Sequence, residues 1–408
     1  MSNVQPSSSK PLSPAKLVAG IVGVAAVIAI WVAFRTASGG AFNGPMVQML
    51  STDGFTVVWE SGDSTQMTVR LTDENGALIQ EVPAQSDHGR YEATFTGLSP
   101  ATVYEYALVF AASPERGGRV TTAPDPATPF RFLAVGDSGS GKPEQFALAR
   151  QMATYPAPLV IHTGDLVYMD GEREDYPEKY YQPYADLIRN AALYPCLGNH
   201  DVLTEDGQPM LDAFVLPENG PDGVTPERNY WFDFGDVRFA AIDSTAPFST
   251  LRDDIAPWLD GVFKDAGDRW KVLFFHHAVV THGKYEGSGK VIECILPICD
   301  RYHVELVLTG HNHMYERSHP LREKQIVGAG EGTVFITTGA GGMSLYELGH
   351  GDPPAELAFQ HNTGFSFTVI DVTDEKMSVQ QIDLGGEVID AFEVPRQPVA
   401  SQPVGQAS

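Results

Sequence analysis

The chain has 408 residues, of which 52 are Asp or Glu and 27 are Lys or Arg, so its formal net charge is −25. This length accommodates two or three domains, and an apolar fraction of 43% supplies a core of ordinary size. So acidic a surface repels nucleic-acid backbones and excludes a basic groove that follows phosphates. An anionic substrate needs a local positive charge to override this field, and a pair of bound cations would supply it.

The N-terminal region carries a targeting signal. Residues 1–16 are rich in Ser, Pro and Lys and are predicted to be disordered. Residues 17–34 form an uncharged apolar run of 18 residues, the lower limit for a membrane-spanning helix. Lys10 and Lys16 precede the run, which favours a cytoplasmic N-terminus. We therefore predict a membrane anchor.

A cleaved signal peptide is the alternative, because small residues follow at 37–41. Under either interpretation the rest of the chain is extracytoplasmic. It would lie in the periplasm or at the cell surface, anchored by residues 17–34, or be secreted after signal cleavage.

Residues 45–124 have the pattern of a small all-β sandwich. Short runs at 55–61, 67–73 and 92–110 alternate with turn residues, and no helical period intervenes. Trp59 on an early strand and the segment GLSPATVYEY resemble a fibronectin type III-like module, although another β-sandwich lineage would have the same architecture. No titratable cluster occurs here, so we expect a spacing or docking role.

Residues 129–394 alternate apolar runs with amphipathic segments, which is typical of an α/β domain. A Pro-rich joint at 123–129 precedes this domain, and residues 395–408 are predicted to be a disordered tail. The predicted strands are Phe130–Val135, Leu159–Thr163, Val237–Ile242, Val272–Phe275, Val304–Thr309, Val334–Thr338 and Phe365–Val372.

The three cysteines are too few for a disulfide framework and form no CxxC zinc pattern. Cys294 and Cys299 are five residues apart in a segment with a helical pattern, so they do not share a face. We predict that these two and Cys196 are buried free thiols.

Five short segments place a side chain that can bind metal where an apolar run ends. In chain order these side chains are Asp137; Asp165 with Tyr168; Asn199 with His200; His276 with His277; and His311 with His313. Ligands of open α/β sheets collect beyond the carboxyl ends of the strands, so we expect the five segments to converge on one crevice. Each tripeptide alone is a weak signal, but the ordered set favours a metal site over isolated core histidines.

The series GDSG, GDLVY, GNHD, a strand-terminal His and GHNH resembles the metallophosphoesterase superfamily, and within it the purple acid phosphatases. Most members of the superfamily have a His where Gly139 stands, and most lack a tyrosine at the position of Tyr168. The sandwich in front is also similar to the N-terminal module of that family. The resemblance implies a four-layer α-β-β-α fold.

The resemblance implies two metal ions. Asp137, Asp165, Tyr168 and His313 would hold the first, and a bridging Asp165, Asn199, His276 and His311 the second. Carboxylates and a phenolate suit iron(III), whereas an amide and imidazoles suit divalent zinc, iron or manganese. The activity implied is hydrolysis of small-molecule phosphate monoesters by a metal-bound hydroxide.

Two further residues receive catalytic roles from the resemblance. His200 would bind the phosphate or protonate the leaving alkoxide, and Asp201 would orient its ring. His276 is aligned as the ligand because it directly ends an apolar run, although Ala278 stands where the family often has Pro. His277, His282 and Tyr285 are candidates for the substrate rim or belong to a solvated loop.

The same metal core serves a phosphodiesterase or nucleotide hydrolase, which is the alternative activity. The loops Asp170–Ile188 and Leu203–Arg228 would decide between the esters and carry no readable code. A catalytically silent surface-binding protein is disfavoured because all seven predicted ligands are present. A zinc protease or metallo-β-lactamase is disfavoured because HExxH and HxHxDH are absent.

Overall fold

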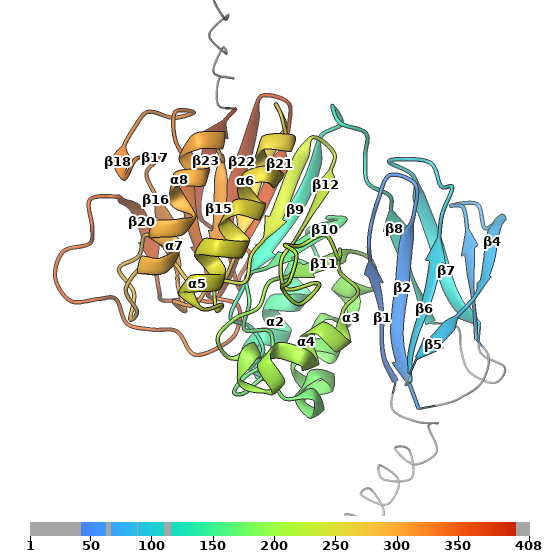
Figure 1. Ribbon diagram of the computed structural model, residues 1–408. Coiled ribbons are helices and arrows are strands. Elements are labelled where there is room, and N and C mark those ends of the chain that lie inside the picture. The colour runs from blue at the N-terminus through green and yellow to red at the C-terminus, as the bar shows by residue number, and fades with distance from the viewer. Residues whose placement is uncertain (1–41, 63–66, 88, 110–115, 397–408) are drawn as a thin grey trace, which may run out of the picture.

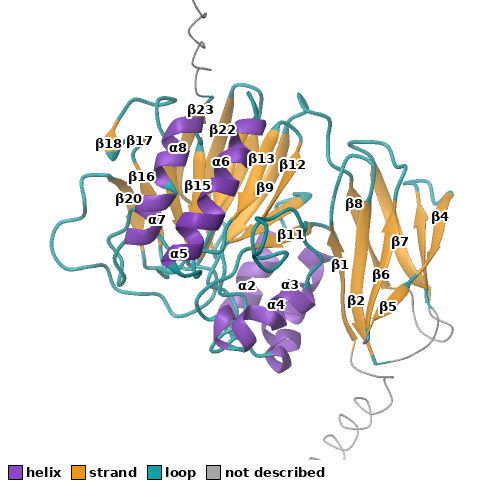
Figure 2. Ribbon diagram, in the orientation of Figure 1, coloured by secondary structure: helices purple, strands orange, loops and turns teal. Residues whose placement is uncertain are grey.

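The computed structural model describes residues 42–62, 67–87, 89–109 and 116–396. These residues fold into an N-terminal β-rich domain and a larger layered α/β domain (Figure 1). Helices form the outer layers of the larger domain, and strands form its centre (Figure 2).

Two sheets form the centre of the larger domain. The first sheet continues into the N-terminal domain, and within the larger domain its strand order is β23-β22-β21-β9-β10-β11. The second sheet has the order β12-β13-β14-β15-β19-β16-β20. The strands of the first are β9 (Phe130–Val135), β10 (Leu159–His162), β11 (Ala192–Pro195), β21 (Ser366–Val372), β22 (Lys376–Asp383) and β23 (Val388–Pro395). Those of the second are β12 (Tyr230–Phe234), β13 (Val237–Ala241), β14 (Trp270–Phe274), β15 (Leu306–Thr309), β16 (Tyr315–Ser318), β19 (Val334–Thr338) and β20 (Leu357–His361). A separate hairpin pairs β17 (Leu321–Arg322) with β18 (Gln325–Ile326).

Helices cover the outer faces of both sheets. On the first sheet lie α2 (Pro143–Met152) and α3 (Gln182–Ile188), and on the second α6 (Ala256–Asp265), α7 (Gly289–Cys294) and α8 (Leu296–Tyr302). Shorter helices are α4 (Gln208–Ala213) and α5 (Phe248–Thr250), and single helical turns occur at Arg173–Asp175, Pro177–Tyr181, Asp201–Leu203, Glu205–Gly207 and Leu251–Ile255.

The two sheets pack face to face through apolar side chains. The ring of Phe132 on β9 meets that of Phe239 on β13 at a centroid distance of 5.2 Å. Rings of 5 to 6 Å separation contribute beyond their buried area, and both side chains are fully buried. The layer order is therefore helix, sheet, sheet, helix, as predicted.

All seven predicted strands are present, with ends that shift by at most two residues. In the larger domain, strands β11, β12, β16, β20, β22 and β23 and the β17–β18 hairpin were not predicted. Strand β11 has only four residues and ends in Pro195, β22 largely alternates polar and apolar residues, and β23 is the mostly exposed or half-buried edge strand of the first sheet.

The N-terminal domain is a sandwich of antiparallel sheets. Strands β1 (Phe42–Gln48), β2 (Phe55–Ser61), β5 (Gln85–Asp87) and β6 (Arg90–Phe95) face β3 (Thr68–Thr72), β4 (Leu78–Pro83), β7 (Val103–Val109) and β8 (Arg116–Thr121). Its core is aromatic: Trp59 is fully buried and stacks on Tyr91 at 5.6 Å. A β-rich N-terminal domain is therefore present, and its fibronectin type III-like lineage stays a prediction, as do the exact domain boundaries.

The Pro-rich joint does not make the two domains independent. Val47 of β1 pairs in parallel with Ala192 of β11, so the first sheet continues through both domains as one sheet of ten strands. The buried amide of Gln48 donates to the carbonyl of Leu193 at 3.1 Å and accepts from the backbone N–H of Val215 at 3.2 Å.

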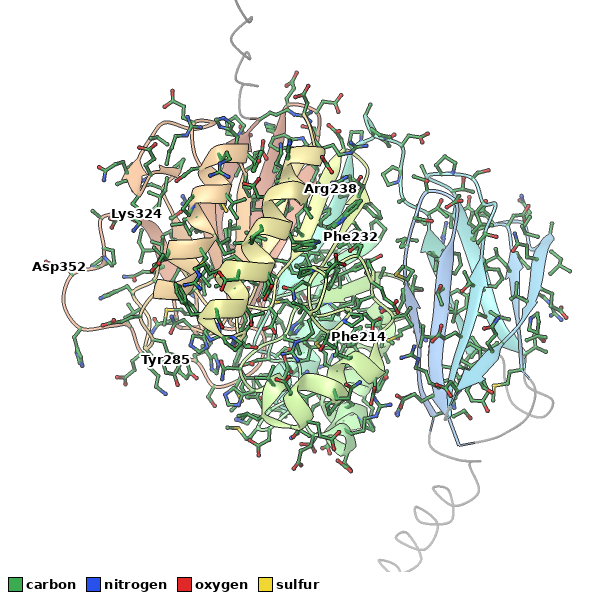
Figure 3. All side chains as sticks on the ribbon, viewed as in Figure 1. Phe214, Phe232, Arg238, Tyr285, Lys324 and Asp352 are labelled. Carbon is green, nitrogen blue, oxygen red and sulfur yellow. The ribbon has the colours of Figure 1, made fainter. Side chains whose placement is uncertain are left out.

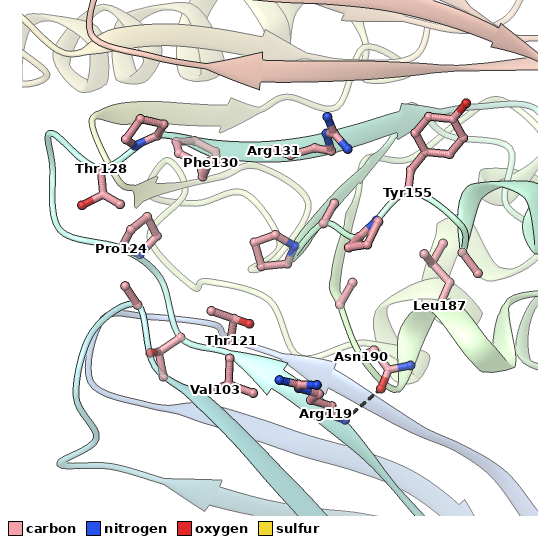
Figure 4. A pocket seen from close by; sticks show the side chains of 18 of the residues that line it. Val103, Arg119, Thr121, Pro124, Thr128, Phe130, Arg131, Tyr155, Leu187 and Asn190 are labelled. Carbon is pink, nitrogen blue, oxygen red and sulfur yellow. Dashed lines mark hydrogen bonds between the residues drawn. The ribbon is translucent and has the colours of Figure 1, made fainter. Parts of the chain in front are cut away.

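A groove of about 630 Å³ lies between the domains (Figure 4). The sandwich lines it with residues such as Val103 and Thr121, and the larger domain with Phe130 and Tyr155. At one side of the groove the backbone N–H of Arg119 donates to Oδ1 of Asn190 at 2.8 Å (Figure 4).

The predicted anchor or signal at 17–34 lies outside the described residues, as do residues 1–16 and 397–408. Within the described ranges, no helix has the length and apolar character needed to cross a membrane. The three cysteines are free thiols, and Cys196 and Cys299 are buried as predicted. Cys294 is only half-buried, which corrects the prediction, because the helix breaks at Ile295, ahead of Pro297, and leaves Cys294 at the end of α7.

The continuous sheet predicts that Gln48→Leu destabilises the whole protein. Leu193 O and Val215 N would lose their partner in a buried setting, which costs about 2 kcal/mol of unfolding free energy. Urea denaturation would measure this loss, and Gln325→Leu, an exposed position on β18, is the matched control. Equal stabilities of the two variants would contradict the sheet-wide coupling.

Candidate metal centre

The five strand-end segments meet at one edge of the two sheets. Strands β9, β10 and β11 run parallel in the first sheet, and β14 and β15 run parallel in the second, so their carboxyl ends point the same way within each sheet. One ligand atom from each of Asp137, Asp165 and His276 lies within 4.8 Å of the other two. All three side chains are buried.

The first predicted ligand set gathers around the hydroxyl of Tyr168. This oxygen lies 3.1 Å from Oδ1 of Asp137, 2.8 Å from Oδ2 of Asp165 and 2.9 Å from Nε2 of His313. A phenol has one hydrogen to donate, and three potential acceptors surround it.

The second predicted set gathers around the amide oxygen of Asn199. This Oδ1 lies 3.0 Å from Nε2 of His276 and 2.7 Å from Nδ1 of His311. Oδ2 of Asp165 is 3.4 Å from Nε2 of His276, so the carboxylate of Asp165 lies between the two sets. The position suits a bridging ligand.

Two of the histidines are oriented by backbone carbonyls. Nδ1 of His276 lies 2.9 Å from the carbonyl oxygen of Thr163, and Nδ1 of His313 lies 2.7 Å from that of Ser344. A carbonyl only accepts, so each Nδ1 carries the hydrogen. Each Nε2 therefore turns toward the carboxylates, the arrangement found when imidazole binds a metal.

These contacts bring together more hydrogen-bond acceptors than there are hydrogens to donate to them. A bound cation would offset the repulsion between these acceptor atoms. Burial alone would lower the pKa of His276, but the charge of Asp165 and their hydrogen bond raise it to about 10. Burial, followed by the charges of Asp137 and Asp165, raises the pKa of Tyr168 above its usual value. The metal-free cluster thus retains protons that bound cations would displace. Both donor sets fit a metal ion.

Three of the predicted ligand residues have a left-handed backbone. The φ angles are 55° at Asp137, 54° at Asp165 and 70° at His311, a region that residues other than glycine rarely occupy. The backbone N–H of His311 donates to Oδ2 of Asp137 at 2.9 Å, and that of His200 donates to Oδ1 of Asp165 at 2.8 Å. Such strain is typical of functional sites, where the surrounding structure maintains it.

The backbone at Gly139 lies against the segment that carries Tyr168. The backbone N–H of Tyr168 donates to the carbonyl of Gly139 at 2.9 Å. A Cβ atom at Gly139 would lie 1.8 Å from the carbonyl oxygen of Leu166. A histidine therefore does not fit at position 139 on this backbone, and the missing side chain allows the close approach of the segment that carries Tyr168.

Asp201 contacts the backbone under the site and not the ring of His200. Its Oδ2 accepts from the N–H groups of Asp165 at 2.7 Å and Gly198 at 2.9 Å, and its Oδ1 from that of Leu166 at 2.9 Å. Nδ1 of His200 donates instead to the carbonyl of Met169. Asp201 is therefore placed to fix the loops that carry Asp165 and Asn199, and its predicted orienting role passes to Met169.

The neighbouring rim candidates lie around the second ligand set. The hydroxyl of Ser244 accepts from the backbone N–H of His277 at 3.1 Å and lies 2.9 Å from Nδ1 of the same residue. The ring of His277 is 4.6 Å from that of His311, while Nδ1 of His282 lies 3.3 Å from Oε1 of Gln360. His277 thus pairs with Ser244, whereas His276 faces Asp165.

Tyr346 lies at the site but was not predicted from the sequence. Its ring stacks on His313 at a centroid distance of 3.9 Å and an interplanar angle of 14°. The residue follows a glycine-rich loop with no period that would mark it, so only the folded structure brings it to the site. Thr163 and Ser344 were missed for a related reason, because they act through their carbonyl groups.

Comparisons with known proteins agree with this geometry. Residues 130–315 match the family of calcineurin-like phosphoesterases. An uncharacterized protein of Mycobacterium tuberculosis is 27% identical over 307 residues, which are 62% of this chain and 58% of that protein. Purple acid phosphatase 7 of Arabidopsis thaliana is 25% identical over 286 residues, which are 63% of this chain and 84% of that enzyme.

A solved structure with the same fold is that of purple acid phosphatase PPD1 from yellow lupin seeds. It has a TM-score of 0.74 at 18% identity and covers 88% of this chain and 75% of its own. The chain spans only about 58% of the length of the mycobacterial relative. The match of residues 130–315 agrees with the predicted superfamily, and purple acid phosphatases are among the similar proteins.

The contacts of Asp201 predict that Asp201→Asn weakens the site although Asp201 is not itself a predicted ligand. An amide group would turn N–H hydrogens toward backbone N–H donors, which leaves buried groups unpaired and costs about 2 kcal/mol. We expect lower thermal stability and fewer bound metal ions, measured by calorimetry and elemental analysis. Asp212→Asn, on α4, is the control, and wild-type metal content in Asp201→Asn would contradict the positioning role.

Proposed function

We propose that this chain, whose residues 130–315 match the calcineurin-like phosphoesterases, is a metal-dependent hydrolase of phosphate monoesters, similar to purple acid phosphatases. The observation that carries the proposal is the pair of donor sets joined by Asp165. One set surrounds the hydroxyl of Tyr168 and the other the amide oxygen of Asn199.

The two sets differ in charge, and the metals should differ accordingly. Asp137, Asp165 and Tyr168 offer anionic oxygens, which suit iron(III), with His313 as the fourth ligand. Asn199, His276 and His311 offer mainly neutral donors, which suit a divalent ion of zinc, iron or manganese. When bound, two such cations would lower the pKa of water and neutralise charge that develops on the phosphoryl group.

The protein's own groups orient the substrate and handle the leaving group. His200 is half-buried, and its Nδ1 hydrogen is held by the carbonyl of Met169. Its Nε2 is therefore free to contact a phosphate oxygen, and a protonated ring can donate to the departing alkoxide. The ring of Tyr168, 4.5 Å from that of His200, supports this orientation.

The location of the enzyme rests on the sequence. The apolar run at 17–34 supports an extracytoplasmic domain, either anchored or secreted. At a net charge of −25, the substrate is a small ester that reaches the cations and not a nucleic acid that needs a basic groove.

Metal analysis with a panel of esters tests the proposal. We expect about two metal ions per chain, with iron as one of them, and faster turnover of monoesters than of diesters or nucleotides. Chelation should abolish turnover, and added metal should restore it. Faster diester turnover would assign the phosphodiesterase alternative, and a metal-loaded protein that hydrolyses none of the esters would contradict an enzymatic function.

Tyr168→Phe tests the iron assignment directly. An iron(III)–phenolate pair absorbs visible light, so the purified protein should be coloured and this variant should lose the band. Tyr180→Phe removes a hydroxyl from a fully buried ring outside the cluster and should retain the band. A band that survives Tyr168→Phe would show that another group produces it.

A further inference from the structure

Two tyrosines outside the ligand sets cover the metal-binding histidines. The ring of Tyr285 stacks on His311 at 4.5 Å and 29°, and that of Tyr346 stacks on His313 at 3.9 Å and 14°. The two tyrosine rings meet edge to face, with centroids 5.8 Å apart and planes at 76°. They form one aromatic wall against the predicted ligands of both metals.

This wall is open to solvent. Tyr285 is 39% exposed, on the left side of the larger domain in Figure 3, and Tyr346 is half-buried. Large apolar side chains are also exposed close to His200, because Met169 is 52% and Leu203 60% exposed. Exposed apolar side chains beside a polar site are typical of a surface that binds a ligand.

Lys284 brings a positive charge to the same place. Its Nζ lies 4.9 Å from the ring centroid of Tyr285 and 4.7 Å from that of Tyr346, within the range of a cation–π contact. No carboxylate within the described ranges pairs with this ammonium group. In a chain of net charge −25, it attracts the phosphate end of any ester, whatever its alcohol.

We propose, on the basis of the proposed function, that Tyr285 and Tyr346 form a subsite for an aromatic ring on the alcohol side of the ester. The rings lie within about one stacking distance of His311 and His313, so an ester held at the cluster has its alcohol within their reach. A planar ring gains offset or edge-to-face contacts with them that a saturated group of equal size does not. The preferred substrates are therefore phosphate monoesters whose alcohol carries an aromatic ring.

Benzyl phosphate and cyclohexylmethyl phosphate test the subsite. The two alcohols are primary and nearly equal in size, so they differ mainly in aromaticity. We expect the protein to prefer benzyl phosphate by about 3–10-fold in kcat/KM, the range that one aromatic contact supplies. Tyr285→Leu and Tyr346→Leu keep an apolar side chain and should each reduce this ratio toward one.

Three controls separate the loss of an aromatic contact from the loss of metal and from an effect on the phosphate. Metal content must remain at the wild-type level in both variants, because each tyrosine contacts a predicted ligand. Tyr302→Leu, on the outer helix α8, should leave the ratio unchanged. Lys284→Met should lower kcat/KM for both esters alike, together with its salt dependence, because it acts on the phosphate.

The subsite is overturned if the wild-type ratio is close to one, if both tyrosine variants keep the wild-type ratio at full metal content, or if Lys284→Met reduces the ratio as much as they do. Failure of the proposed function looks different, because then neither ester is hydrolysed by the metal-loaded protein.

Discussion

The candidate metal centre depends on the close approach of hydrogen-bond acceptors around the hydroxyl of Tyr168. One phenolic hydrogen faces two carboxylates and an imidazole nitrogen, all in a buried setting. Such a cluster is unfavourable unless positive charge is added and the backbone holds the groups in place. The surrounding features serve the second requirement: left-handed residues follow the strands, and Asp201 binds three backbone N–H groups beneath the loops.

The sequence was sufficient for the parts of the fold that local patterns determine. Buried parallel strands are nearly continuous apolar runs, and Asp137 or His276 follows such a run directly, so both the strands and their convergence were predictable. The pairing of Val47 with Ala192 was not, because it joins residues 145 positions apart through a single register point. Nor was the role of Asp201, because a carboxylate next to His200 in sequence suggests a partner for that ring, and only the folded loops show that it accepts from the backbone instead.

The continuous sheet gives the β-rich domain a structural connection to the cluster. Gln48 binds the carbonyl of Leu193 on β11, and the chain leaves this strand at Pro195 to reach Asn199 four residues later. The N-terminal domain therefore packs against the strand that positions a predicted ligand. A sandwich that served only as a spacer would not need a buried side chain between the two domains.

The contact between Gly139 and the segment of Tyr168 has a consequence for how such sites can change during evolution. A histidine at position 139 collides with the carbonyl of Leu166, so it cannot be gained while this segment keeps its place. Conversely, the loss of Tyr168 alone would leave the predicted first metal with one ligand fewer and no room for a replacement at 139. An exchange between the two kinds of site would therefore need both replacements together with a shift of this backbone segment. A site with Tyr168 and one with a histidine at position 139 are therefore not connected by single substitutions. Related sequences are expected to keep both Gly139 and Tyr168 or to change both.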